Sequence, residues 1–318
     1  MFNGLLAGFL WGLDTVILGV ALSRSSFVST EQAIFLAPFI STFIHDLCSS
    51  LWMLIYMGIK KQYRKVIEAL KTKSGKYIVL AALVGGPVGM TGYVLSIKYI
   101  GAAYTAIISA LFPAVGAFLS YLFLKEKMKI YQMIGLAFSI GGVIILGYMP
   151  GGDGVRNGFI GFLFALLCVL GWAAEAVIIA YGLKDPEISD EQALQIRQMT
   201  SAIFYGIIIL PILKGWKMTL EIIPTSVAGI ILISALFGTA SYLFYYKAIS
   251  KIGASKAMAL NITYSAWAII FGYLLLKETV SMKDIVCAVV IIGGSIVAGG
   301  DIREFVKIGR KDSSFNNQ

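Results

Sequence analysis

The chain has 318 residues, of which 58% are hydrophobic and 14% are charged, and its mean hydropathy is +0.84. This composition excludes an ordinary soluble globular protein and indicates a protein with many membrane-spanning segments. The net charge of +9 does not predict a nucleic-acid partner, because most basic residues lie in the connections between apolar segments.

Ten apolar segments are long enough to span a bilayer as helices. In chain order they occupy residues 4–22, 32–58, 77–98, 103–124, 131–148, 158–183, 193–213, 226–247, 256–276 and 283–300. The sequence therefore predicts an all-α integral membrane protein with ten transmembrane helices. Cys48, Cys168 and Cys287 lie within these segments and lack the spacing of metal ligands, so neither a metal nor another cofactor is expected.

The basic residues predict the orientation of these helices in the membrane. If the N-terminus is cytoplasmic, eighteen Lys and Arg residues face the cytoplasm, seven of them from Lys60 to Lys76, and seven face outward. This count leaves out Arg197, which is assigned to the start of the seventh helix. Cytoplasmic connections carry the excess of positive charge in membrane proteins. Both termini are therefore predicted to be cytoplasmic, with a polar, disordered tail at residues 302–318.

Two parts of the chain repeat each other. Residues 97–147 and 249–299 align without a gap at an offset of 152 positions. The matches include Tyr-Leu-x-Leu-Lys-Glu at 121–126 and 273–278, and Ile-Gly-Gly at 140–142 and 292–294. Five helices per half is an odd number, so the second half must enter the membrane in the opposite orientation. We expect two inverted five-helix repeats, at residues 1–150 and 151–301.

Two such halves, each with a terminal Lys-Glu pair followed by a Gly-rich helix, resemble the drug/metabolite transporter superfamily of the EamA type. Three stretches carry a closer resemblance to the bacterial choline permeases that feed phosphorylcholine decoration of cell-surface polymers. They are His45-Asp46, Gly-Gly-Pro-x-Gly-Met at 85–90, and Lys-Tyr-Ile-Gly at 98–101 running on to Leu-Phe-Pro-Ala at 111–114. The resemblance implies a secondary transporter that imports choline or a related quaternary amine across the bacterial cytoplasmic membrane by alternating access. The alternative is an EamA-type exporter of amino acids or other small metabolites.

Two acidic residues inside apolar segments each follow a tryptophan by three positions: Asp14 follows Trp11, and Glu175 follows Trp172. Residues three apart share a face of a helix, so an indole ring and a carboxylate adjoin. Quaternary ammonium ions bind to such aromatic faces through cation–π attraction. The alternative for the aromatic residues is packing or anchoring at the membrane interface. The candidate substrate-binding residues are Trp11, Asp14, Tyr93, Trp172, Glu175, Tyr242, Tyr245 and Trp267.

Proton coupling has three candidate residues, His45, Asp46 and Glu175. His45 is the only histidine of the chain, and imidazole exchanges protons near neutral pH. Two alternatives stay open, because His45 could be a packing residue and Asp46 could bind the substrate ammonium directly.

Two further helices have unusual composition. The glycines and Pro87 of the third helix either let it bend or let a neighbouring helix approach closely. Gln195 and Gln198 in the seventh helix predict that its first half borders water.

An intramembrane enzyme is the other class of protein that carries Asp and His residues within apolar segments. The sequence holds no His-Glu-x-x-His, no aspartate-rich diphosphate motif and no Gly-x-Gly-Asp within a span. It also has no Walker loop for an ATP-driven pump. We therefore expect a transporter, not an enzyme, that works in the lipid bilayer as a monomer or loose homodimer and takes a small cation.

Overall fold

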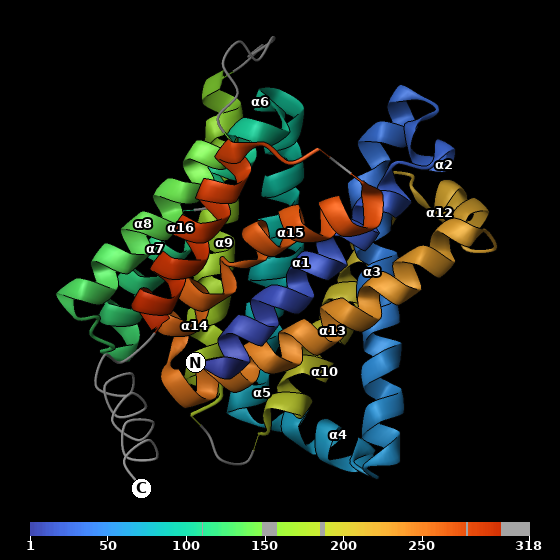
Figure 1. The fold of residues 1–318 in the computed structure, drawn as a ribbon. Helices are drawn as coiled ribbons and strands as arrows, with labels where there is room; N and C mark the ends of the chain where they lie inside the picture. The colour runs from blue at the N-terminus through green and yellow to red at the C-terminus, as the bar shows by residue number, and fades with distance from the viewer. Residues whose placement is uncertain (110, 148–157, 185–187, 278, 300–318) are drawn as a thin grey trace, which may run out of the picture.

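Every element in the described part of the chain is a helix (Figure 1). The computed structural model describes residues 1–109, 111–147, 158–184, 188–277 and 279–299. The expected boundary between the halves at residues 150 and 151, and the expected tail at 302–318, lie outside these ranges. The prediction of an all-helical membrane protein is confirmed.

The helices of the described residues cover the predicted apolar segments, several of which are divided into shorter elements. The first half contains α1 (Phe2–Leu22), α2 (Ser25–Val28), α3 (Glu31–Ile59), α4 (Tyr63–Lys71), α5 (Lys73–Leu83), η1 (Val84–Met90), α6 (Thr91–Ser109), α7 (Phe112–Leu119), η2 (Ser120–Leu124) and α8 (Ile130–Gly147). The second contains α9 (Gly158–Gly182), α10 (Asp190–Phe204), η3 (Tyr205–Ile209), α11 (Leu210–Ile212), α12 (Trp216–Ile222), α13 (Ser226–Ile252), α14 (Ala254–Asn261), α15 (Tyr264–Phe271), η4 (Gly272–Leu276) and α16 (Met282–Gly299). The η elements are π-helical turns.

Eight helical stretches of the described residues are long and apolar enough to cross a membrane. Shorter apolar helices cover Phe112–Leu124 and Ile130–Ile145, where the fourth and fifth spans are predicted. One predicted boundary is wrong: the sequence places a break between residues 98 and 103, but α6 continues through it to Ser109. Apolar residues on both sides of that point allow the helix to continue.

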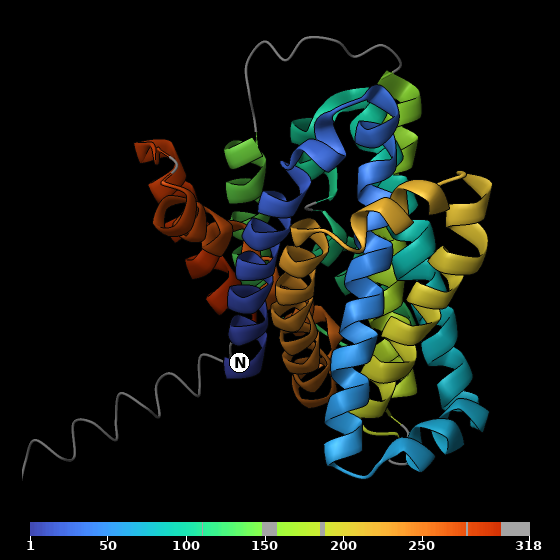
Figure 2. The ribbon, with the colours of Figure 1, turned by 90° about the vertical axis from the view of Figure 1, so that its right-hand side faces the viewer.

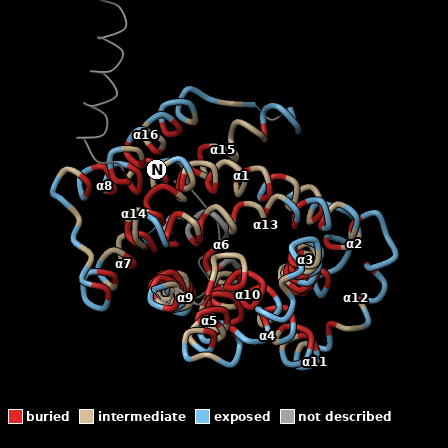
Figure 3. The backbone as a smooth tube through the Cα atoms, turned by 90° about the horizontal axis from the view of Figure 1, so that it is seen from below, coloured by how far each residue is buried: buried red, intermediate tan, exposed pale blue. Residues whose placement is uncertain are grey.

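Large apolar side chains cover much of the outer surface, as expected of a protein that faces lipid. Phe118, Phe138, Phe159 and Ile207 are all more than 60% exposed. Figure 3 shows exposed residues along the perimeter and buried residues on the sides that face the middle. These apolar outer faces are the contact surface for the bilayer.

The stretch Asp190–Ile212, where the seventh span (193–213) is predicted, has its first part in the interior, while Ile207 and Ile212 near its end are exposed. Its mean hydropathy is 1.3, against 2.4 for Gly158–Gly182. Leu194 and Ile196 of α10 are buried in a core that also contains Met53, Ile78 and Ile179 from α3, α5 and α9. Because other helices cover residues 192–198 of α10, the polar side chains of that segment contact protein and not lipid.

Helix contacts in one half have counterparts in the other. α1 packs along α13, and η1 and α6 pack along α9. α15 packs against α1 as α7 packs against α9, while α8 pairs with α16. Lys125 and Lys277, 152 positions apart, both end a π-helical turn with a left-handed backbone (φ 60° and 58°). α1 starts in the lower half of Figures 1 and 2 and runs upward, whereas α9 starts at the top and runs downward.

Glu126 joins the two halves. The sequence predicts that Lys125-Glu126 and Lys277-Glu278 anchor helix ends and stabilise hairpins. In the structure the Glu126 carboxylate accepts hydrogen bonds from the backbone N–H groups of Ala254 and Ser255 (3.0 Å each) and from the Ser255 hydroxyl (2.7 Å). It therefore caps the N-terminus of α14, where unpaired N–H groups favour an anion. Glu278 lies outside the described residues.

We predict that Glu126→Ala lowers the free energy of unfolding by about 2 kcal/mol, because it removes a charged cap with three hydrogen bonds. Lys127→Ala, one residue away and exposed, is the control and should change the melting temperature in detergent little. Equal effects of the two substitutions would contradict the capping role.

Candidate functional site

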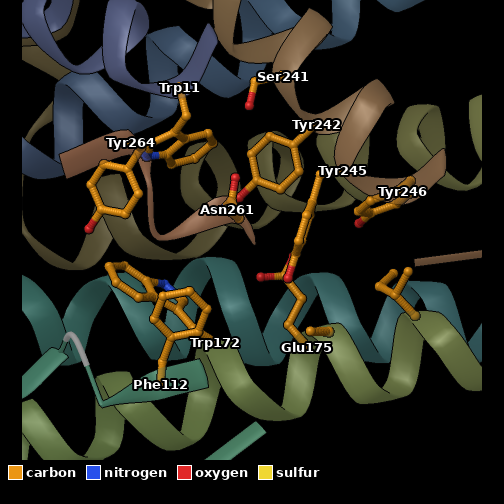
Figure 4. A pocket seen from close by; sticks show the side chains of 12 residues that line it. Trp11, Phe112, Trp172, Glu175, Ser241, Tyr242, Tyr245, Tyr246, Asn261 and Tyr264 are labelled. Carbon is orange, nitrogen blue, oxygen red and sulfur yellow. The ribbon is translucent and has the colours of Figure 1, made fainter. Parts of the chain in front are cut away.

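A cavity lies between α1, α7, α9, α13, α14 and α15 (Figure 4). The space between its lining atoms, including the part open to the outside, is about 610 Å³. The lining residues are Trp11, Phe112, Trp172, Glu175, Ala176, Ile179, Ser241, Tyr242, Tyr245, Tyr246, Asn261 and Tyr264.

The cavity walls are mainly aromatic. Trp11 on α1 and Trp172 on α9 lie on opposite sides of the cavity (Figure 4). The Trp11 ring contacts Tyr242 edge to face, with ring centroids 4.9 Å apart. Trp172 makes the same kind of contact with Phe112 at 5.9 Å. These contacts fix the indole rings, so their faces are available without a large loss of side-chain entropy on binding.

One wall carries the acidic group Glu175. Its Oε1 accepts a hydrogen bond of 2.8 Å from Nε of Arg197 on α10. Arg197 is only 4% exposed, and it also donates to Gln198 Oε1 (2.8 Å) and to the Tyr242 hydroxyl (3.1 Å). Its guanidinium carbon lies 4.5 Å from the centre of the Tyr242 ring. A buried charge needs this degree of pairing, since an unpaired one is strongly destabilising.

The other acidic residue of the Trp-x-x-acid pair, Asp14, has a comparable partner. His45 Nε2 on α3 lies 3.1 Å from Asp14 Oδ1. Ser234 on α13 donates hydrogen bonds to the Asp14 carboxylate and, at 3.1 Å, to its backbone carbonyl. The acid on the first long helix of each half, α1 or α9, thus pairs with a basic side chain on the next long helix, α3 or α10.

Asp46 lies between these two pairs. Its Oδ1 is 3.6 Å from His45 Nδ1 and 3.5 Å from Arg197 Nη1. Asp14, His45, Asp46, Arg197 and Glu175 therefore form a continuous charge network from α1 to α9. Three carboxylates face one guanidinium and one imidazole, so the ionised network carries one net negative charge with His45 protonated and two with His45 neutral. This excess of negative charge favours a cation in the adjoining cavity.

Glycines make room for these side chains. A Cβ at Gly85 in η1 would clash with the Glu175 carboxylate, and one at Gly89 would lie 3.0 Å from Trp172 Cδ1. On α13, a Cβ at Gly238 would lie 2.8 Å from both Asp14 Oδ2 and His45 Nε2. Of the two alternatives for the glycines of the third helix, the structure shows close approach of a neighbour, α9.

The structure brings together five of the eight candidate substrate-binding residues. Trp11, Trp172, Glu175, Tyr242 and Tyr245 line the cavity. The roles assigned to them from sequence stay predictions.

The other three candidates lie beside the cavity. Asp14 belongs to the charge network, and Tyr93 packs against Trp172 at a centroid distance of 5.4 Å. Trp267 packs against Phe9 at 5.1 Å and is not among the lining residues.

Sequence reasoning missed several site residues. Tyr246 and Asn261 lack a motif that marks them, and Phe112 was noted only as part of the Leu-Phe-Pro-Ala stretch. Tyr264, which shares a helix face with Trp267, is a candidate from its spacing, and it lines the cavity. Arg197 could have been found, because an arginine inside a predicted membrane span needs a carboxylate partner. The expectation that Gln195 and Gln198 border water is wrong. Both are fully buried, and Gln195 donates to Ser50 at 3.1 Å.

Comparisons with known proteins agree with this architecture. Residues 1–148 and 159–300 both match the EamA-like transporter family. The chain is 34% identical to Protein LicB of Haemophilus influenzae, covering 92% of this chain and 95% of that protein. It is 24% identical to an uncharacterized transporter of Clostridium kluyveri, over 77% of this chain and 78% of that protein.

A solved structure described only as the crystal structure of a protein has the same fold, with a TM-score of 0.65 and 15% identity over 93% of this chain and 96% of that chain. The chain belongs to the EamA-like transporter family. It is therefore a multi-pass membrane transporter and not an enzyme, as predicted.

We predict that Gly238→Ala destabilises the protein by about 1–3 kcal/mol, because the added methyl group displaces the Asp14–His45 pair. Gly229→Ala in the same helix is the matched control, since a Cβ there meets no atom within 4 Å. Thermal unfolding in detergent should separate the two variants. Equal melting temperatures would mean that the pair can shift without cost.

Proposed function

We propose that this chain is a permease that imports choline or a related quaternary ammonium compound by alternating access. The observation that carries the proposal is the cavity in which Trp11 and Trp172 face each other beside Glu175. Phe112, Tyr242, Tyr245 and Tyr264 are further aromatic residues of the cavity walls.

A quaternary ammonium ion has no N–H group to donate, so hydrogen-bond acceptors alone do not select it. It is attracted by the faces of aromatic rings and by negative charge. The cavity offers both, because the indole rings of Trp11 and Trp172 lie on its walls and the charge network beside it has an excess of carboxylates. A smaller primary amine would contact fewer of the aromatic faces.

The proposed architecture is ten transmembrane helices in two inverted repeats, at residues 1–150 and 151–301. Two observations support it: the family matches the chain twice, and the contacts of α1 with α13 have their counterpart in those of α9 with η1 and α6. The cavity draws residues from both halves. Rocking of the halves about it would expose the site alternately to the two sides of the membrane.

In the proposed orientation both termini face the cytoplasm of a bacterial cell. Support comes from the basic helix α4, which lies at the same end of the molecule as the start of α1 (Figures 1 and 2). A membrane potential that is negative inside would favour uptake of a cation by about 2.3 kcal/mol per 100 mV.

Proton coupling follows from the same charge network. His45, Asp46 and Glu175 are the candidate proton carriers, and each belongs to it. A proton on any of them adds one positive charge close to the cavity. Protons and the substrate cation therefore compete for the same excess of negative charge, which is the simplest chemistry of exchange.

We predict that choline raises the melting temperature of the purified protein and binds in calorimetry, while glycine and other amino acids do neither. Betaine, which keeps the trimethylammonium group and adds a carboxylate, separates cation recognition from recognition of a zwitterion. Binding of neutral or zwitterionic metabolites without binding of choline would favour the exporter alternative.

We predict that Trp172→Ala weakens choline binding about thirtyfold, because a desolvated cation–π contact is worth about 2 kcal/mol. Trp172→Phe should retain part of the affinity, since a weaker aromatic face remains. Trp267→Ala is the control, because Trp267 packs against Phe9 outside the lining residues. A packing role for Trp172 would instead give the same loss in the Ala and Phe variants.

A further inference from the structure

Arg197 is the basic group that lies against the proposed substrate site. It contacts Glu175 of α9 at 2.8 Å, Asp46 of α3 at 3.5 Å and Tyr242 of α13 through both its hydroxyl and its ring. Glu175 and Tyr242 also line the cavity. The guanidinium and a cation in the cavity would therefore share one carboxylate and one aromatic ring.

We propose that Arg197 is an internal competitor of the substrate: it leaves Glu175 for Asp46 when a quaternary ammonium ion binds, and it returns to Glu175 to release that ion. The inference rests on the proposed function and identifies the residue that regulates occupancy of the same site.

Electrostatics supplies the reason for the exchange. While Arg197 pairs with Glu175, that carboxylate is neutralised and the guanidinium repels a second cation. A quaternary ammonium ion needs only the negative charge of Glu175, because it donates no hydrogen bonds. Binding is favoured when Arg197 moves away from the cavity and leaves the negative charge of Glu175 without a positive partner.

The structure provides a second partner for Arg197 at low cost. An unpaired buried guanidinium would be strongly destabilising, but Asp46 Oδ1 already lies 3.5 Å from Nη1. A change of side-chain torsions within α10 can strengthen this pair while the bond to Glu175 breaks. Gln198, which accepts a hydrogen bond from Nη1 at 2.8 Å, can remain a partner throughout.

The exchange also links the two halves of the molecule. Asp46 contacts His45 at 3.6 Å, and His45 contacts Asp14 at 3.1 Å. A stronger Arg197–Asp46 pair competes with the His45–Asp46 contact and so changes the electrostatic environment of Asp14. Occupancy of the cavity is thereby communicated from α9 to α1 through groups that already touch.

The test compares choline binding and choline uptake in Arg197→Gln and Asp46→Asn. Arg197→Gln removes the competitor, so choline should bind about tenfold tighter. Uptake into proteoliposomes should show a lower KM together with a maximal rate at least several times lower, because nothing displaces the bound cation. Asp46→Asn removes the second partner, holds Arg197 on Glu175, and should weaken choline binding about tenfold.

Two further variants keep the result interpretable. Arg64→Gln removes an exposed arginine of α4 and should leave choline affinity unchanged, which controls for net charge. Arg197→Lys keeps the charge but loses the planar contacts with Glu175, Gln198 and Tyr242. It should bind choline more tightly than the unaltered protein, and it serves if Arg197→Gln does not fold.

The outcomes separate the two levels of the account. If the unaltered protein does not bind choline, the proposed function and this inference both fail. If it binds choline but the folded Arg197 variants bind it no more tightly, or if their KM and maximal rate fall without a gain in affinity, the competitor role alone is overturned. Tighter choline binding together with a lower maximal uptake rate in Arg197→Gln supports the competitor role.

Discussion

The charge network constrains the rest of the structure. Burying three carboxylates in a bilayer protein is costly unless each lies beside a positive group, so α1, α3, α9 and α10 must pack with their charged side chains in register. The contacts of 3.5 and 3.6 Å at Asp46 connect a pair in the first half to a pair in the second. Any motion of one half against the other has to keep these charges paired, which limits the number of accessible states.

The aromatic cavity depends on this arrangement. Trp172 and Glu175 lie on the same face of α9, and they fit there because η1 presents Gly85 and Gly89 to that face. Tyr242 then lies between the cavity and Arg197, with its ring 4.9 Å from Trp11 and 4.5 Å from the guanidinium carbon. Tyr242 thus contacts both the aromatic wall and the charge network, so a movement of Trp11 or of Arg197 would displace the same ring.

Much of this organisation could be predicted from the sequence, because it depends on the spacing of residues within short segments. The apolar segments and the Trp-x-x-acid spacing at Trp11 and Trp172 each need only one stretch of chain, and the offset of 152 positions needs only the comparison of two stretches. Partners far apart in sequence were not predictable in this way. Arg197 lies 22 positions from Glu175, and Glu126 lies 128 positions from Ala254.

The wrong prediction for α10 has a similar cause. Gln195 and Gln198 are predicted to border water because they are polar, but both are buried among helices and form hydrogen bonds with protein groups. The role of Trp267 in substrate binding stays a prediction, and its ring packs against Phe9. Spacing along one helix fixes which side chains share a face, and only tertiary packing decides what that face meets.

The most direct test of the account is an experimental structure of the protein determined with choline bound. The account predicts that the trimethylammonium group lies between the indole rings of Trp11 and Trp172, beside the Glu175 carboxylate. Choline bound away from these three residues, or a cavity that stays empty at saturating choline while the protein transports it, would contradict the account.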